Sequence, residues 1–211
     1  MGREPTGTQG GSTKARIVDA AIATLQREGY SGASARAIAA TGGFNQALIF
    51  YHFGSVRDVL IAALDQTSRA RMDAYRDAAA EATDLVELTK VAGRIYREDL
   101  ASGHVKVMVE LIAGASSDPE LAPAIVTRIE PWIAFATEQA ARVGGTSSLG
   151  ALAPPEDVAY AVVALFLGLE LLSHLEGDTT RPERLFELAD RLAIALTTLG
   201  LMPPPANGGT S

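Results

Sequence analysis

The sequence has no cysteine among its 211 residues. This absence excludes disulfide bonds, thiol catalysis, cysteine-ligated zinc and iron–sulfur clusters, and it fits a cytoplasmic protein. The amino terminus has no apolar segment, so we expect no secretory signal peptide. The three histidines, His52, His104 and His174, are far apart in the chain and lack the spacing of metal ligands, so we expect neither a metal site nor a cofactor.

Sequence motifs of common enzyme classes are also missing. The chain contains no glycine-rich phosphate-binding or dinucleotide-binding motif, and no Ser-His-Asp arrangement can be placed. We therefore expect a protein that is not an enzyme. The longest apolar run, residues 158–175, is interrupted by Glu170 and His174. Because a charge within lipid is costly, this run predicts a buried helix and no association with a membrane.

Negative charge dominates the chain, with a net charge of −7, but it is unevenly distributed. Residues 1–60 contain six basic and four acidic residues, a net charge of +2. The remaining residues contain 12 basic and 21 acidic residues, a net charge of −9. Because phosphates repel an acidic surface, any DNA contact should be confined to the first 60 residues.

The spacing of apolar residues predicts an all-α fold with about nine helices. Capping residues and glycine mark the helix ends. Ser34, Asn45 and Ser55 are expected to cap the starts of the second, third and fourth helices, and Gly29 is expected to end the first. The expected helices span about residues 12–28, 34–41, 45–51, 55–79, 85–101, 104–115, 122–143, 155–175 and 182–199. Pro131 should kink or break the seventh helix.

Composition and pattern predict four segments. Residues 1–11 and 202–211 are rich in glycine and polar residues or proline and should form a disordered arm and tail. Residues 12–60 should form a helix-turn-helix domain, because three short helices are separated by a glycine turn. Residues 61–201 should form a larger helical domain.

Residues 14–60 carry a more specific signal than a helix-turn-helix alone. The segments IVDAAIATLQREGYSGAS and ARAIAATGGFNQALIFYHFGSVRDVL resemble the signature of the TetR family of bacterial transcriptional regulators. The matching positions include Ala20-Ala21, Gly29-Tyr30, Ile38-Ala39, Gly43, Tyr51-His52-Phe53, Ser55 and Leu60. The resemblance implies a homodimeric repressor that binds double-stranded, palindromic operator DNA and is released by a small-molecule effector.

The start of the third predicted helix is suited to the major groove. Its residues are small or carry amides, and Gln46 can form two hydrogen bonds with adenine. By resemblance, Arg36 lies where relatives reach the groove edge, although a solvated arginine is the alternative. Tyr51 and His52 offer polar tips to phosphates. The predicted DNA contacts are Lys14, Arg16, Arg36, Asn45, Gln46, Ala47, Tyr51, His52 and Arg57.

Two residues depart from the family pattern. Phe50 stands where the family usually has a tyrosine, and Val56 stands where it usually has a lysine, both of which contact phosphates. Arg57 could replace the lost charge or could be a solvated charge. These departures leave open a protein-interaction module that keeps the fold but has lost DNA binding. An enzyme is a separate alternative, and it fits poorly because the histidines are dispersed and the motifs of common enzymes are missing.

The larger domain should bind a small, partly apolar effector. Pockets between bundle helices are lined by aromatic and methionine side chains with a few polar groups. The predicted ligand-binding residues are Tyr96, Met108, Glu110, Trp132, Phe135, Phe166, Glu170 and His174. For the apolar members, an ordinary core position is the alternative. Because an ionised carboxylate in an apolar helix needs a partner, Glu170 could bind the ligand or pair with His174 one turn later.

The eighth and ninth predicted helices correspond to the usual dimer interface of the family. Their composition agrees, because Val158, Val162, Leu165, Leu169 and Leu172 form a stripe in a helix that is apolar nearly all round. Such a helix must be covered on both sides. We therefore expect a homodimer, with these helices packed against those of a second subunit.

Overall fold

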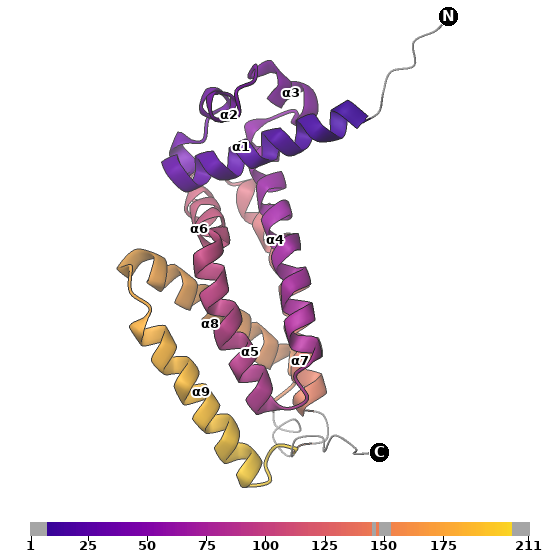
Figure 1. Ribbon diagram of the computed structural model, residues 1–211, viewed down its shortest axis with the longest axis vertical. Coiled ribbons are helices and arrows are strands. Elements are labelled where there is room, and N and C mark those ends of the chain that lie inside the picture. The colour runs from indigo at the N-terminus through magenta and orange to yellow at the C-terminus, as the bar shows by residue number, and fades with distance from the viewer. Residues whose placement is uncertain (1–7, 145–146, 148–152, 204–211) are drawn as a thin grey trace, which may run out of the picture. The chain divides into compact units, whose positions relative to one another are not determined.

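The computed structural model describes residues 8–144, 147 and 153–203 (Figure 1). Within these residues all regular secondary structure is helical, which confirms the predicted all-α class. The helices of this part of the chain are α1 (Thr8–Gly32), α2 (Ala35–Gly42), α3 (Ala47–Phe53), α4 (Val56–Ala80), α5 (Leu85–Ser102), α6 (His104–Gly114), α7 (Leu121–Gly144), α8 (Pro155–Glu176) and α9 (Thr180–Thr198).

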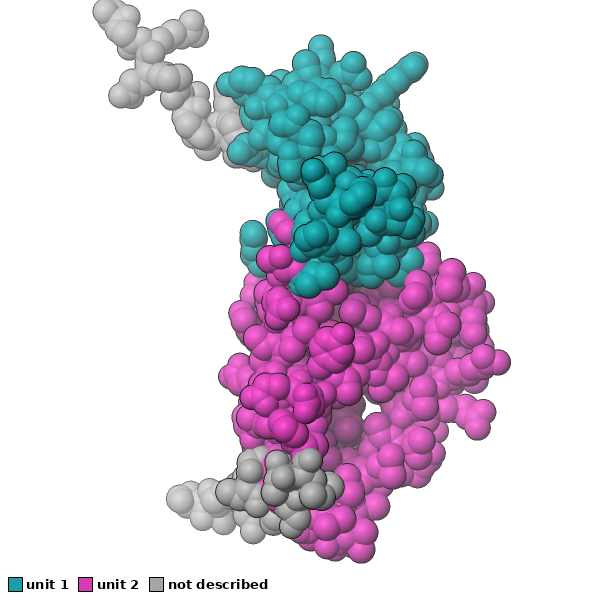
Figure 2. Space-filling view, turned by 180° about the vertical axis from the view of Figure 1, so that it is seen from behind, with its two compact units in different colours: residues 1–69, 106–126 teal, residues 70–105, 127–211 magenta. Residues whose placement is uncertain are grey.

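The chain forms two compact units, each built from separate stretches of sequence (Figure 2). In the described part of the chain, unit 1 contains residues 8–69 and 106–126, and unit 2 contains residues 70–105, 127–144, 147 and 153–203. The boundaries fall within α4, α6 and α7. These boundaries divide the chain by packing. The predicted division by function, into a DNA-binding domain up to residue 60 and a ligand-binding domain from residue 61, stays a prediction.

The first three helices share a small core in unit 1. Ile17 and Leu25 of α1, Ile38 of α2 and Ile49 of α3 are completely buried. Burial of an aliphatic side chain of this size contributes roughly 1.5–3 kcal/mol relative to exposure. These contacts hold α2 and α3, both too short to be stable alone, in a fixed arrangement on α1.

Helix ends in unit 1 follow the local sequence. The Oγ atoms of Ser34 and Ser55 accept hydrogen bonds from the backbone N–H three residues later, at 3.2 and 3.1 Å. Both predicted caps are thereby confirmed. Gly29 has φ 72° and ψ −178°, so the regular helix geometry of α1 is interrupted at the predicted residue before the chain continues to Gly32.

Two features of the helices differ from the simplest expectation. α1 begins at Thr8, so residues 8–11 of the predicted disordered arm are helical. Once a helix is nucleated, each further residue adds a hydrogen bond, and a helix can therefore extend beyond its packed segment. α7 continues through Pro131 as one 24-residue helix, so of the two predicted outcomes the break does not occur and the kink stays a prediction. Residues 1–7, 145–146, 148–152 and 204–211 lie outside the described residues, so the predicted disorder of the tail and of the first residues of the arm is not described.

Unit 2 packs α5 against α8 and α9. Gly93 of α5 packs against Phe186 of α9, since a Cβ atom added at Gly93 would be in van der Waals contact with the Phe186 side chain at 3.4 Å. Tyr96 of α5 is completely buried, and its hydroxyl lies 2.5 Å from the hydroxyl of Ser173 in α8. The interior of this unit is therefore aromatic with a small number of polar groups.

α8 has two different faces. Its buried residues include Leu169, Glu170 and Ser173, whereas Leu165 and Leu172 are more than half exposed. Among the described helices, α8 alone passes a length-and-composition test for a membrane span by itself, and α3 with α4 passes it only if the bent pair is counted as one span. The exposed apolar face of α8 requires a covering partner in water.

Candidate nucleic-acid interface and effector site

α2, a four-residue connection and α3 form a helix-turn-helix in unit 1. Gly43 ends α2 in the left-handed conformation, with φ 65°, and its N–H donates to the carbonyl of Ala39. Asn45 Oδ1 accepts a hydrogen bond from the N–H of Ala47 at 2.9 Å, which fixes the start of α3. Asn45 thus caps the helix as expected, although α3 begins at Ala47 rather than at residue 45.

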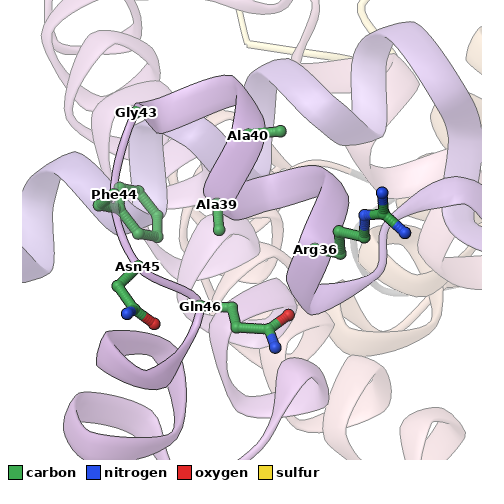
Figure 3. A pocket seen from close by; sticks show the side chains of 7 residues that line it. All are labelled: Arg36, Ala39, Ala40, Gly43, Phe44, Asn45 and Gln46. Carbon is green, nitrogen blue, oxygen red and sulfur yellow. The ribbon is translucent and has the colours of Figure 1, made fainter.

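An open hollow lies beside the connection between α2 and α3 (Figure 3). Its three polar lining residues, Arg36, Asn45 and Gln46, are exposed. The structure therefore brings together the two side chains predicted to read bases, Arg36 from α2 and Gln46 from the residue preceding α3. The complete lining consists of Arg36, Ala39, Ala40, Gly43, Phe44, Asn45 and Gln46.

The outer side of α3 is exposed as well. Tyr51 is 82% exposed, and its ring contacts the His52 imidazole edge-on at a centroid distance of 4.9 Å. Phe50 is 51% exposed, so this residue is not needed to fill the core. Ala47 is exposed and small, which leaves room for close approach at the first turn of α3. These exposures agree with a surface that meets another molecule.

Two predicted DNA contacts lie in α1, and both are exposed. The Lys14 ammonium lies 5.9 Å from the ring centroid of Phe53 at the end of α3. Arg16 donates a hydrogen bond from Nη2 to the carbonyl of Gly42 at 3.3 Å. Both cations are thereby placed within unit 1 beside the helix-turn-helix.

Arg57 is engaged within unit 1. Its Nε donates to Asp118 Oδ2 at 2.6 Å, and its Nη1 pairs with Glu120. The hydrogen bond from Arg57 is the main reason why the pKa of Asp118 lies below its ordinary value. A phosphate contact by Arg57 would require this guanidinium to exchange or share its carboxylate partners, and the contact stays a prediction.

Glu110 binds the end of α1. Its Oε2 accepts a hydrogen bond from the backbone N–H of Tyr30 at 2.8 Å, directly after the irregular Gly29. The Tyr30 hydroxyl donates to Asp118 at 3.4 Å. The predicted ligand-binding residues Met108 and Glu110 thus belong to unit 1, whereas the other six belong to unit 2. The sequence did not reveal this role of Glu110.

A cluster of polar side chains is enclosed in unit 2, and we call Arg71, Tyr75, Asp99, His104 and Glu170 the buried cluster. Asp99 is 1% exposed, forms an ion pair with Arg71 and accepts a hydrogen bond from the Tyr75 hydroxyl. Burial raises the pKa of Asp99 to about 6, although Tyr75 and Arg71 both act to lower it. Burial likewise raises the pKa of Tyr75, which stays protonated.

Glu170 is 6% exposed. Burial, and then the negative charge of Asp99, raise the pKa of its carboxyl to about 8, while the charge of Arg71 acts in the opposite direction. The suggested pair with His174 is not formed, because the His174 side chain is exposed to solvent whereas Glu170 is buried, and no ion pair joins the two among the described residues.

His104 is buried beside the aromatic residues of unit 2. Burial, and then the charge of Arg71, lower the pKa of the imidazole to about 4, so the ring is neutral at pH 7. Its Nδ1 atom has no hydrogen-bond partner in the described part of the chain. The Trp132 ring lies 6.4 Å from the imidazole and 4.9 Å from the Tyr75 ring, measured between centroids.

Two more aromatic rings lie close to Tyr75 in unit 2. Phe135 and Phe166 lie with their centroids 6.3 and 6.2 Å from that of Tyr75, and Phe166 lies 5.7 Å from Tyr96. The structure thus brings Tyr96, Trp132, Phe135, Phe166 and Glu170 together as predicted neighbours. Arg71, Asp99 and His104 are cluster members that the sequence analysis did not select as ligand-binding residues.

Comparison with known proteins identifies the family. Residues 17–63 match the model of the bacterial regulatory proteins of the tetR family. Uncharacterised HTH-type transcriptional regulators of Mycobacterium tuberculosis and Mycobacterium bovis are 26% identical to this chain over 190 residues, which cover 90% of this chain and 94% of theirs. These matches support a TetR-family transcriptional regulator, with the DNA-binding segment of the family at residues 17–63. The family and the relatives are DNA-binding regulators and not enzymes.

Solved structures agree with this assignment. The multidrug binding protein EbrR in complex with imidazole is 28% identical, with a TM-score of 0.62, and the match covers 98% of this chain and 100% of EbrR. EbrR has also been solved with proflavin and with malachite green. The fatty acid degradation regulator FadR from Bacillus halodurans has a TM-score of 0.69 at 18% identity, covers 90% of this chain and 96% of its own, and supports the fold alone.

Proposed function

We propose that this TetR-family regulator is a repressor that binds a palindromic operator as a homodimer and is released from it by a small, partly apolar ligand. The observation that carries the proposal is the shared exposure of Arg36 and Gln46 on one hollow beside the small first residue of α3. Arginine and glutamine are the side chains that bind guanine and adenine through paired hydrogen bonds. We assign base contacts to these two residues.

Phosphate contacts should surround these base contacts. Lys14, Arg16, Tyr51 and His52 are placed in unit 1 with α3, and the first 60 residues have a net charge of +2 in a chain of net charge −7. Fixed phosphate contacts orient a protein on DNA without reading its sequence. We infer that DNA binds through this part of unit 1 and that the acidic remainder of the chain is kept away from the phosphates.

A second copy of the chain should cover the apolar faces of α8 and α9. The exposed side chains on these helices are large and aliphatic, and several are more than half exposed. They include Val158, Val162, Leu165, Leu172, Leu175, Leu185, Leu188, Leu192 and Ile194. Apolar surface of this extent favours association over exposure to water. A second copy suits α8 better than lipid, because Glu170 and Ser173 occupy its opposite, buried face within unit 2.

The effector should bind in unit 2. EbrR binds imidazole, proflavin and malachite green, and we infer that this chain likewise takes a small molecule in its helical body. Such a ligand releases DNA only if it binds one conformation of the dimer better than the other. A coupling of roughly 1–3 kcal/mol weakens operator binding about 5–150-fold, and operator DNA must weaken ligand binding by the same factor. A cytoplasmic location follows from this role.

The decisive experiment is a mobility shift with DNA from upstream of the chain's own gene. Replacing Arg36 and Gln46 by alanine should each cost roughly 1–3 kcal/mol of binding free energy and relax the sequence preference. Arg94→Ala, at an exposed position of α5 in unit 2, is the matched control and should bind like the wild type. Unchanged affinity and sequence preference in the Arg36→Ala, Gln46→Ala double variant would show that these are not the base-reading residues.

A further inference from the structure

The buried cluster of unit 2 contains one more acid than it can neutralise. Its one guanidinium, Arg71, is ion-paired with Asp99, which also accepts the hydrogen bond from Tyr75. Glu170 is 6% exposed and has no hydrogen bond or ion pair to any residue that the structure describes. Because an ionised carboxylate in such a place is costly without a partner, Glu170 needs either a proton or a cation beside it.

A second polar atom of the cluster is also unused. Nδ1 of the 7% exposed His104 has no hydrogen-bond partner within the described residues. Buried polar atoms are rarely left unpaired, and each exception calls for a reason such as an absent ligand. Two nine-tenths-buried groups, the Glu170 carboxyl and the His104 imidazole, are therefore available to a molecule that enters this interior.

Aromatic rings surround these two groups. The Trp132 ring lies near both His104 and Tyr75, at centroid distances of 6.4 and 4.9 Å, and the Phe166 ring lies 6.2 Å from that of Tyr75. The faces of such rings attract cations, most strongly where water is excluded. An unpaired acid within aromatic walls is the chemistry that recognises a flat cation.

We propose that the buried cluster is the binding site for an aromatic cation whose positive charge pairs with Glu170, while the rings around Tyr75 contact its faces. The inference rests on the proposed function, because it identifies the chemical class of the effector that unit 2 binds. An aromatic anion is excluded by the same charges, since Arg71 is already neutralised by Asp99 and a second carboxylate lies beside them.

Without a bound cation, the Glu170 carboxyl holds a proton. Burial and the charge of Asp99 raise the pKa of Glu170 to about 8, so its carboxyl is neutral at pH 7. A bound cation stabilises the carboxylate, and the proton then leaves to the buffer. The titratable or charged groups that face Glu170 or its neighbours are Arg71 and Tyr75 from α4, Tyr96, Glu98 and Asp99 from α5, His104 from α6 and Glu183 from α9.

Isothermal titration calorimetry of the full chain, without DNA, tests the proposal with three probes of similar shape. These are N-methylquinolinium, which is cationic, methylnaphthalene, which is neutral, and naphthoate, which is anionic. At pH 7, the cation should bind at least about tenfold more tightly than the other two probes. Titration in two buffers of different ionisation enthalpy should show the release of close to one proton per bound cation, and none for methylnaphthalene.

Substitution assigns the proton to Glu170. Glu170→Gln keeps the shape of the protonated side chain and should abolish proton release and weaken the cation at least about tenfold, with methylnaphthalene unchanged. Glu138→Gln, at an exposed position of α7, is the matched control and should behave like the wild type. If Glu170→Gln does not fold, the wild-type ranking of the three probes and their proton release still decide the question.

Three results overturn the proposal. They are equal or tighter binding of methylnaphthalene or naphthoate, cation binding without proton release, and no binding of any probe up to its solubility limit. A mobility shift separates these failures from a failure of the proposed function. If the operator complex forms but the cation does not bind, only this inference fails. If the cation binds with proton release but leaves the operator complex intact, the site stands and the effector role fails.

Discussion

Gly114, the last residue of α6, is predicted to be intolerant of alanine because of the Tyr30 ring. A Cβ atom at Gly114 would lie 2.5 Å from Cγ and 2.6 Å from both Cδ atoms of that ring. Optimal carbon–carbon separations are about 3.5–4.0 Å, so the ring would have to move by roughly 1 Å. The Tyr30 residue is held at both ends, by Glu110 at its backbone N–H and by Asp118 at its hydroxyl.

Two opposing effects determine how much Gly114→Ala changes the free energy of unfolding. Overpacking costs roughly 1–3 kcal/mol, while replacing glycine by alanine in a helix returns up to about 1 kcal/mol. Gly114→Ala should therefore lower the free energy of unfolding by about 1–2 kcal/mol, equivalent to about 2–8 °C in Tm for a chain of this size. Gly144→Ala is the control, since Gly144 is also the last residue of its helix but has nothing within 4 Å of its added Cβ.

Urea unfolding at fixed protein concentration measures the free energy of unfolding of both variants, Gly114→Ala and Gly144→Ala. A double-mutant cycle with Tyr30→Ala should then show a coupling of at least about 1 kcal/mol, because alanine at position 114 no longer meets a ring. A Gly114→Ala protein as stable as the wild type, together with no coupling in the cycle, would refute the close packing of α6 on Tyr30.

Two further predictions concern the buried cluster. Asp99→Asn should destabilise the protein by roughly 3–5 kcal/mol in urea unfolding, because it removes the buried partner of Arg71 and leaves this largely enclosed guanidinium only the more distant, exposed Glu98. Glu187→Gln in an exposed pair should change stability by less than about 1 kcal/mol. Similar losses in both variants would contradict the burial of Asp99. Burial raises the pKa of Glu170 to about 8 in the folded chain. In the unfolded chain the same carboxyl should have the ordinary glutamate pKa of about 4.3, so between these pH values the folded chain holds a proton that the unfolded chain has released. Stability should therefore fall as the pH rises from about 4.3 through about 8, and Glu170→Gln should flatten this dependence relative to Glu138→Gln; an unchanged profile would show that Glu170 is ionised when buried.

The parts of the fold that depend on local chemistry could be predicted from the sequence. Ser34 and Ser55 act as caps through hydrogen bonds three residues away, and Gly29 supplies a backbone conformation that other residues rarely adopt. The base-reading candidates Arg36 and Gln46 are close in sequence, so the same local signals that placed the short helices also placed these two side chains.

Partners that are distant in sequence could not be predicted in this way. Glu110 meets a backbone N–H that is 80 positions earlier in the chain, and nothing near Glu110 distinguishes this carboxylate from one that faces a ligand. Asp99 and Arg71 are ordinary helix charges by composition, and only the packing of α4 on α5 shows that they are buried together. Glu170 was recognisable because it interrupts an apolar helix, but its lack of a partner was not.

The footprint of the protein on DNA from upstream of its own gene tests the central claim most directly. A homodimer that reads DNA through α3 should protect two inverted half-sites whose centres lie about 10–10.5 base pairs, or a multiple of that spacing, apart on one face of the duplex. Protection should be lost in the Arg36→Ala, Gln46→Ala variant and kept in Arg94→Ala. A single unpaired site, or protection that survives the double substitution, would contradict a dimeric regulator that reads its operator with this part of unit 1.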